Sequence, residues 1–178
     1  MKNTMRLAFI DIETTGARAT GDRITEVAIK VWESGRVLEA WQSLINPEVN
    51  IPKFIQSLTG ISNETVRHAP LFSELAEKID NLTKDCLFVA HNARFDYGFL
   101  KSEFRRLDIT WNRRVLCTVK LAKALYPQHK RHGLDALIVR HEIVVGERHR
   151  AMGDVDAMLD FYLIAKKEHS ENDFNTAI

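Results

Sequence analysis

The chain has 178 residues, of which 45% are hydrophobic and 28% charged, as in one folded domain with a substantial core. The formal net charge is +1, no apolar run approaches the roughly 18 residues of a membrane helix, and the N-terminus predicts no signal peptide. Two cysteines exclude a disulfide framework, so we expect buried free thiols at Cys86 and Cys117 and a cytoplasmic location.

The charges are unevenly distributed along the chain. Residues 94–150 carry 13 Lys/Arg and 6 Asp/Glu, a net charge of +7, whereas residues 1–93 have a net charge of −2 and residues 151–178 one of −4. A basic middle beside acidic flanks is compatible with a surface that attracts phosphate. It is equally compatible with solvated helix faces, and charge alone leaves both interpretations open.

The N-terminal half predicts a three-stranded meander followed by short helices. Residues 6–13 form a strand that is apolar on both faces, which is typical of a central strand. Further strands are expected at 24–32 and 37–45, joined by a turn at 33–36, and a loop follows at 46–52. Helices are expected at 53–58, 63–68 and 71–82.

The second half alternates helices and strands. We expect strands at 86–90 and 115–119, and helices at 93–107, 120–125, 133–140 and 150–168. A meander followed by alternating elements predicts an α/β domain with a mixed sheet. Residues 1–170 are expected to form a single domain, and residues 171–178 a frayed polar tail.

Two carboxylates share one face at the end of the first strand. Asp11 and Glu13 are two residues apart, so they point the same way, repel each other and lose solvation if the strand is buried. A divalent cation with oxygen ligands is the simplest compensation. The alternative is a strand end that frays into solvent. The Thr14-Thr15-Gly16 turn that follows would let a ligand approach the backbone closely.

Further acidic residues and a histidine stand at the starts of two predicted helices. Asp96 falls in the first turn of its helix, where the helix dipole alone would also favour it. His149 precedes the last helix and Asp154 lies near its start, whereas Asp156 is turned about 200° away and should face solvent. Each residue has a structural explanation by itself, but four carboxylates and a histidine together favour a catalytic site.

Three segments resemble the exonuclease motifs of the DEDDh family, and in particular its DnaQ-like members, which include the proofreading ε subunit of bacterial DNA polymerase III. They are Phe9-Ile-Asp11-Ile-Glu13-Thr-Thr-Gly16, His91-Asn-Ala-Arg-Phe-Asp96 and His149-Arg-Ala-Met-Gly-Asp154. Leu58-Thr-Gly-Ile61 also resembles a segment of that branch, whereas Cys117 stands where many members have Asp. The resemblance spans residues 6–165 and implies a ribonuclease-H-like fold with a mixed five-stranded sheet flanked by helices.

The resemblance implies a two-metal 3′→5′ exonuclease that acts on single-stranded DNA in repair or proofreading and releases nucleoside 5′-monophosphates. Two Mg²⁺ or Mn²⁺ ions would be held by Asp11, Glu13, Asp96 and Asp154, with His149 as the general base. The terminal nucleotide would be held by Thr14, Thr15, Gly16, Ile61, His91, Asn92 and Phe95. Phe95 could instead belong to the core, and His91 with Asn92 could cap the helix. Phosphate-backbone contacts are expected from Arg131, His132, Arg148 and Arg150.

Alternatives remain open at this point. An exoribonuclease that trims RNA would share the same five catalytic residues, and a non-catalytic nucleic-acid-binding domain would share the fold. The expected partner is the 3′ end of a single strand, DNA in preference to RNA. The chain is expected to be either a stand-alone enzyme or a domain of a longer protein that includes or contacts a polymerase or a second module.

Overall fold

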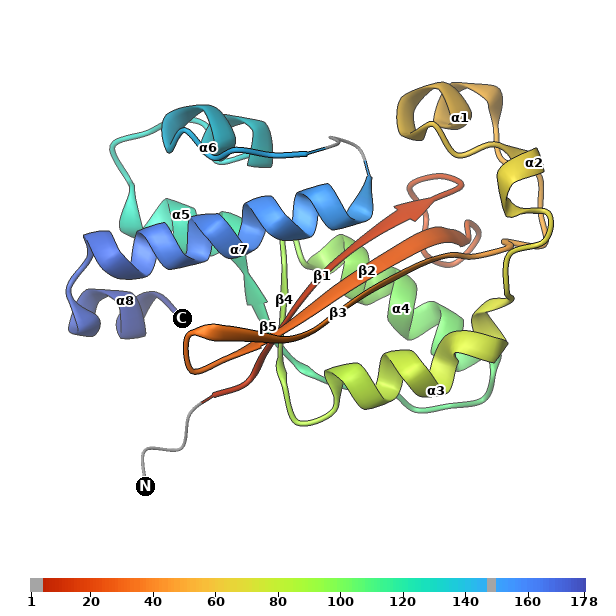
Figure 1. Cartoon of the computed structure of the whole chain (residues 1–178), viewed down its shortest axis with the longest axis horizontal. Coiled ribbons are helices and arrows are strands. Elements are labelled where there is room, and N and C mark those ends of the chain that lie inside the picture. Colours follow the sequence, from red (N-terminus) through yellow and green to blue (C-terminus); the bar gives the residue numbers. More distant parts are fainter. Residues whose placement is uncertain (1–4, 147–149) are drawn as a thin grey trace.

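The computed structural model describes residues 5–146 and 150–178, and one five-stranded sheet forms its centre (Figure 1). The strand order is β3-β2-β1-β4-β5. β1 pairs antiparallel with β2, β2 pairs antiparallel with β3, and β1, β4 and β5 run parallel. This confirms the predicted mixed sheet. The strands are β1 (Leu7–Thr14), β2 (Ile24–Glu33), β3 (Arg36–Leu44), β4 (Leu87–Ala90) and β5 (Arg114–Cys117).

Helices cover both faces of the sheet. In Figure 1, α7 crosses one face with α5, α6 and α8 on the same side, while α3 and α4 cover the other face. In the described part of the chain, none of the helices combines the length and apolar character that a membrane crossing needs. The helices are α1 (Lys53–Thr59), α2 (Asn63–Val66), α3 (Phe72–Thr83), α4 (Arg94–Arg106), α5 (Thr118–Leu125), α6 (Leu134–Arg140), α7 (Ala151–Glu168) and α8 (Glu171–Ala177).

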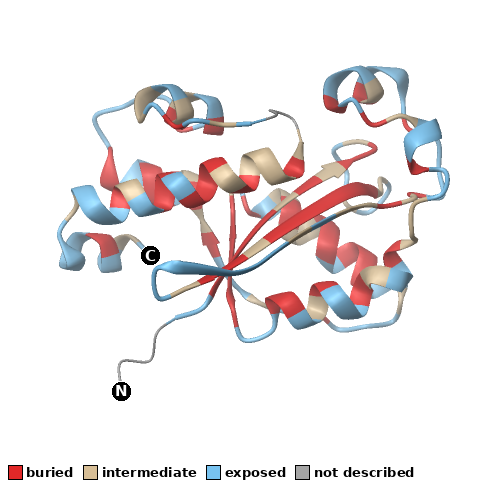
Figure 2. Ribbon diagram, viewed as in Figure 1, coloured by how far each residue is buried: buried red, intermediate tan, exposed pale blue. Residues whose placement is uncertain are grey.

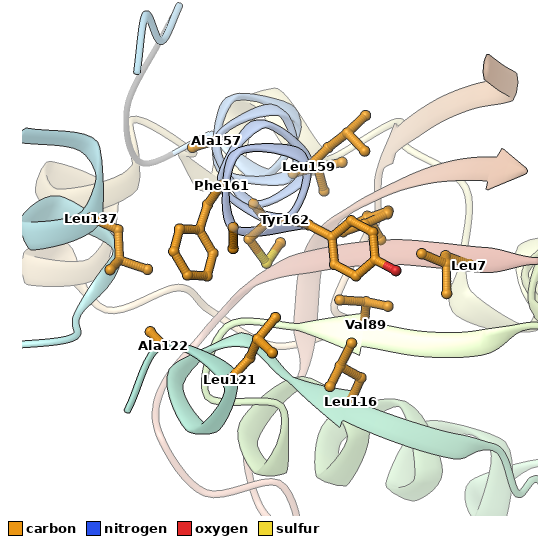
Figure 3. Packing of buried hydrophobic residues seen from close by; sticks show 14 of the residues in the cluster. Leu7, Val89, Leu116, Leu121, Ala122, Leu137, Ala157, Leu159, Phe161 and Tyr162 are labelled. Carbon is orange, nitrogen blue, oxygen red and sulfur yellow. The ribbon is translucent and has the colours of Figure 1, made fainter. Parts of the chain in front are cut away.

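The alternation of β1 produces two hydrophobic cores. Leu7 and Phe9 face α7, and Tyr162 of that helix packs edge-on against the Phe9 ring with centroids 5.5 Å apart. Figure 3 shows Leu7 and Tyr162 in this core. Ile10 and Ile12 face the opposite core, beneath α3 and α4. Figure 2 shows β1 and β2 mostly buried and the edge strand β3 mostly exposed. Burial of each large apolar side chain contributes roughly 1.5–3 kcal/mol, which holds the helices at fixed positions over β1.

β5 ends earlier than the sequence pattern predicts. It pairs with β4 as far as Ala90↔Cys117, and no residue of β4 remains to pair with Thr118. Thr118 instead begins α5, and its hydroxyl donates to the Ala90 carbonyl at 3.4 Å. Both cysteines are free, as expected, but only Cys86 is buried; Cys117 is half-buried.

The expectation of a frayed tail is wrong. Residues Glu171–Ala177 form α8, and the Ser170 hydroxyl caps it by accepting from the Asp173 amide at 3.1 Å. Phe174 is 2% exposed and packs edge-on against Tyr162 at 5.2 Å. One apolar side chain among polar neighbours gives a weak sequence signal, yet it suffices to dock the helix.

Candidate active site

Asp11 and Glu13 lie in the second half of β1 on the face that points toward α7. Leu7 and Phe9, which share that face, belong to the core under α7, so the same face changes from apolar to acidic past Phe9. Both carboxylates are half-buried. In the pairing with β2, Asp11 lies opposite Ala28 and Glu13 lies opposite Glu26.

Asp96 reaches the same end of β1 from the other side of the sheet. It lies in the first turn of α4, is 3% exposed, and its carboxylate accepts hydrogen bonds from the backbone amides of Ile12 and of Asp96 itself. Burial above all, and then the charge of Glu13, raise the pKa of Asp96 to about 8, although the two amides act in the opposite direction. The ionised form of Asp96 is therefore disfavoured beside Glu13, and a bound cation would stabilise it.

Unequal strand lengths explain how Asp96 contacts β1. The parallel pairing of β1 with β4 ends at Phe9↔Val89, and β4 itself ends at Ala90, while β1 continues to Thr14. The chain then turns into α4 at Asn92, whose φ of 61° lies in the left-handed region. The Asp96 carboxylate therefore accepts a hydrogen bond from the Ile12 amide, in the part of β1 that extends beyond the last residue of β4.

The start of α7 lies against β2. Asp154 is in the first turn of α7 and is half-buried. Glu26 of β2, which sequence reasoning missed, is 1% exposed and accepts hydrogen bonds from Arg150 and from the Ala151 amide. A glutamate near the start of a largely apolar strand was the signal that could have revealed it. The catalytic base expected at position 149, and Arg148, lie outside the described residues.

The Thr14-Thr15-Gly16 turn is tied to the start of β2. The Thr15 amide donates to the Arg23 carbonyl at 2.8 Å, and the Arg23 amide donates to the Thr15 hydroxyl at 3.0 Å. Thr14 and Thr15 are both buried. A Cβ atom on Gly16 would lie 2.6 Å from the Asp22 carboxylate, so any larger residue at this position requires the Asp22 side chain to shift.

A cavity of about 250 Å³ opens beside the first turn of α4. Phe95 is half-buried there and stacks obliquely on Phe99 with centroids 4.8 Å apart. The cavity brings together Asn92 and Phe95, which the sequence analysis selected, with four residues that it did not. The lining residues are Ala17, Ala19, Asn92, Arg94, Phe95 and Phe99.

Two other expected nucleotide contacts lie elsewhere. Ile61 is 2% exposed and packs in a small separate core with Ile51, Ile55 and Val66, so the structure does not place it in this cavity. His91 is half-buried, and its Nδ1 lies 2.9 Å from the Thr118 hydroxyl at the start of α5.

The expected phosphate contacts also separate. Arg150, expected to contact the phosphate backbone, is bound to Glu26. Arg131 and His132 line a hollow of about 690 Å³ beside α6, where His132 is 8% exposed and its Nε2 lies 2.8 Å from the His129 carbonyl. Asp156, expected to face solvent, is half-buried and pairs with Lys30 of β2.

Within residues 5–146 and 150–178, no three His, Cys, Asp or Glu side chains form a group that could hold a metal ion. A group completed by His149 lies outside the described residues.

Comparison with known proteins identifies the family. Residues 8–162 match the sequence model of RNase_T, described as Exonuclease. The chain belongs to this exonuclease family. It is therefore a nuclease, and the resemblance to DnaQ-like exonucleases is confirmed.

Relatives named "3′-5′ exonuclease DinG" share this domain. The protein from Staphylococcus epidermidis is 39% identical over 160 residues, and that from Staphylococcus aureus strain MRSA252 is 33% identical over 159 residues. In each case the match covers 89% of this chain but only 18% of the relative. The chain thus spans less than a fifth of the length of these relatives.

Solved exonuclease structures share the fold. A zinc-bound complex of Escherichia coli exonuclease I with single-stranded DNA superposes with a TM-score of 0.85 at 21% identity, covering 97% of this chain and 42% of that one. Exonuclease X bound to duplex DNA with a 5′ overhang gives 0.74 at 23% identity, covering 96% and 98% of the two chains. At these identities the likeness shows the shared fold alone.

Proposed function

We propose that this chain is a metal-dependent 3′→5′ exonuclease domain that hydrolyses the terminal phosphodiester bond of single-stranded DNA. The observation that carries the proposal is the acidic end of β1, where Asp11, Glu13 and the buried Asp96 lie on a domain of the exonuclease family. The name of the relatives, 3′-5′ exonuclease, supports the direction of hydrolysis. A role in DNA repair or proofreading is part of the same proposal.

The donor set suits Mg²⁺ or Mn²⁺. Carboxylate oxygens are the ligands that these ions prefer, and a cation would counteract the burial and the charge of Glu13, which raise the pKa of Asp96. Although the described residues by themselves form no three-ligand group, we assign Asp11, Glu13 and Asp154 to one ion, and Asp11 with Asp96 to the second. When bound, two such ions would supply charge stabilisation to the attacking and leaving oxygens.

The remaining chemistry belongs to side chains of this chain. We assign His149 as the general base that takes the proton from the attacking water, because an imidazole titrates near neutral pH. The attack breaks the last phosphodiester bond and releases a nucleoside 5′-monophosphate, leaving a shortened strand with a new 3′-hydroxyl. The carboxylates of Asp11, Glu13 and Asp96 would hold the ions, and with them the reacting phosphate, at the end of β1.

The cavity beside α4 is proposed to take the terminal nucleotide. Phe95 is next to Asp96 in the chain and offers a half-exposed aromatic ring, which can stack on any base. Asn92 and the nearby turn of Thr14, Thr15 and Gly16 would contact the sugar and phosphate. Single-stranded DNA in the solved exonuclease I complex supports DNA as the substrate class.

The test is digestion of matched single-stranded DNA and RNA labelled at the 5′ end, with Mg²⁺, Mn²⁺ or EDTA. A ladder of shortening 5′-labelled DNA would show 3′→5′ removal. We expect EDTA, Asp11→Asn and His149→Ala each to reduce the rate by more than about 100-fold, beyond the usual effect of residues that only support a metal ligand.

Other outcomes would redirect the proposal. Much faster digestion of RNA would indicate an exoribonuclease. Tight strand binding without hydrolysis would indicate a binding domain. We also propose a polymerase or a second catalytic module as a partner, because the match covers only 18% of the relatives. A cytoplasmic location is proposed as well.

A further inference from the structure

Glu26 is a buried carboxylate that the proposed catalytic set does not use. It lies on β2 directly opposite Glu13 and is 1% exposed. Residues directly opposite in an antiparallel pair share a face, with Cβ atoms about 4.5–5.5 Å apart. A second negative charge beside Glu13 would be unfavourable without a partner of its own.

The partner comes from the start of α7. Arg150 Nε donates to both carboxylate oxygens of Glu26 at 3.2 Å, and its Nη2 donates to Oε1 at 2.6 Å. The Ala151 amide, at the first residue of α7, donates to Oε2 at 3.1 Å. Both carboxylate oxygens are thus engaged, and a forked guanidinium contact restricts orientation as well as distance.

This contact is one helical turn from the Asp154 carboxylate. The Arg150 carbonyl accepts a hydrogen bond from the Asp154 amide at 3.3 Å. Any shift of Arg150 relative to β2 would therefore be transmitted to Asp154. Since Glu13 and Glu26 are paired on adjacent strands, the contact also sets the distance from Glu13 to Asp154.

We propose that Glu26 is a positioning residue: through Arg150 and the Ala151 amide it holds Asp154 at the distance from Glu13 that a shared cation requires. Glu26 is not itself a metal ligand, because both of its oxygens are bound to α7. This inference rests on the proposed function, since it assumes that Glu13 and Asp154 share a cation.

The chain offers two matched controls. Lys30 and Asp156 also join β2 to α7, but beyond Asp154 and with the Asp156 side chain 40% exposed, so Lys30→Gln tests the general attachment of α7. Glu103 of α4 is 2% exposed and accepts from Arg23 Nε at 2.8 Å, so Glu103→Gln tests the loss of a buried Arg–Glu pair. Glu26→Gln keeps the size of Glu26 and one acceptor oxygen, but it removes the charge and replaces the other accepting oxygen with an amide donor.

The primary measurement is calorimetric titration of the substrate-free protein with Mn²⁺, followed by kcat and KM on single-stranded DNA. Supporting residues behind metal ligands are worth about 10–100-fold in metal affinity or activity. We expect Glu26→Gln to weaken Mn²⁺ binding and lower kcat within that range, while KM changes less than kcat. Lys30→Gln and Glu103→Gln should leave Mn²⁺ affinity within about twofold of wild type, even where they lower the melting temperature.

Normal Mn²⁺ affinity and kcat in a folded Glu26→Gln variant would overturn the inference. If that variant does not fold, Arg150→Gln decides, because Arg150 is half-exposed and its loss leaves Glu26 with the Ala151 amide. Wild-type Mn²⁺ affinity in Arg150→Gln would equally overturn it. A wild-type protein that binds Mn²⁺ but degrades no DNA contradicts only the proposed function, whereas one that binds no Mn²⁺ contradicts both.

Discussion

At Gly16 the absence of a side chain leaves room for the Asp22 carboxylate. The Asp22 carboxylate lies where a Cβ would be, at 2.6 Å, and is held there by the Arg18 amide, which donates to it at 2.7 Å. Because the turn also contains Thr14 and Thr15, a shift of Asp22 would disturb residues beside the acidic site.

Gly16→Ala should therefore lower the free energy of unfolding by about 1–3 kcal/mol, the usual effect of overpacking. We also expect a higher KM for single-stranded DNA. Urea denaturation and steady-state kinetics measure the two effects. Gly21→Ala is the matched control, because a Cβ there has nothing within 4 Å; equal effects from the two variants would contradict the steric explanation.

At the scale of elements, α7 carries a like-charge pair on the side of Lys30. Burial first, and then the charge of Asp156 four residues earlier, raise the pKa of Asp160, while Lys30 acts in the opposite direction. A raised carboxyl pKa means that ionisation disfavours the folded state. The destabilisation is present at neutral pH and disappears once both folded and unfolded states are protonated.

Asp160→Asn should accordingly stabilise the protein at pH 7 by about 0.2–0.5 kcal/mol, the size of like-charge repulsion between residues four apart on a helix. The gain should shrink as the pH falls toward about 4, the ordinary pKa range of Asp. Urea denaturation at several pH values measures it. A gain that grows on acidification would contradict the sign of the pKa shift.

Phe174 is the buried residue of α8. Phe174 is 2% exposed against Tyr162, so Phe174→Ala should cost up to about 3–5 kcal/mol, as for other buried aromatic residues. Ile178→Ala, at a position 41% exposed, should stay within about 0.5 kcal/mol of wild type. Thermal melting measures both variants. Equal melting temperatures would show that Phe174 does not hold α8 against the fold, as expected of a frayed tail.

At the scale of the whole molecule, several of the basic residues in the segment 94–150 form ion pairs within the fold. Arg113 pairs with Asp80, Arg106 with Glu103, and Arg150 with Glu26. Lys130 and Arg131, by contrast, are exposed, and Arg131 lines the hollow beside α6. In Figure 1, α6 lies beside α7, the helix whose first turn carries Asp154.

We expect Lys130→Ala combined with Arg131→Ala to weaken single-stranded DNA binding and to make it less dependent on salt. Each phosphate contact that is lost lowers the slope of log affinity against log salt by about 0.7 for a single strand. The control is Arg36→Ala combined with Lys84→Ala. Both residues are exposed and lie at the end of the sheet opposite the acidic end of β1. Identical salt slopes in both double variants would show that only net charge matters.

The sequence by itself determined the five strands, the mixed sheet and the exonuclease family. Period-two alternation in β1 and helical periodicity in α3 and α4 are local properties, so they can be recognised without knowing which elements touch. The motif around Asp11 and Glu13 could also be recognised from the sequence, because both residues lie on one short strand.

Only the tertiary structure decided which residues surround that motif. Glu26 and Arg150 are 124 positions apart, Ala17 and Ala19 meet Phe99 across a cavity, and Ile61 is buried in a core of its own. Phe174 makes α8 part of the fold through a contact with Tyr162. Such contacts depend on how the sheet brings segments that are distant in the sequence together. A local pattern of residues does not predict which segments will meet.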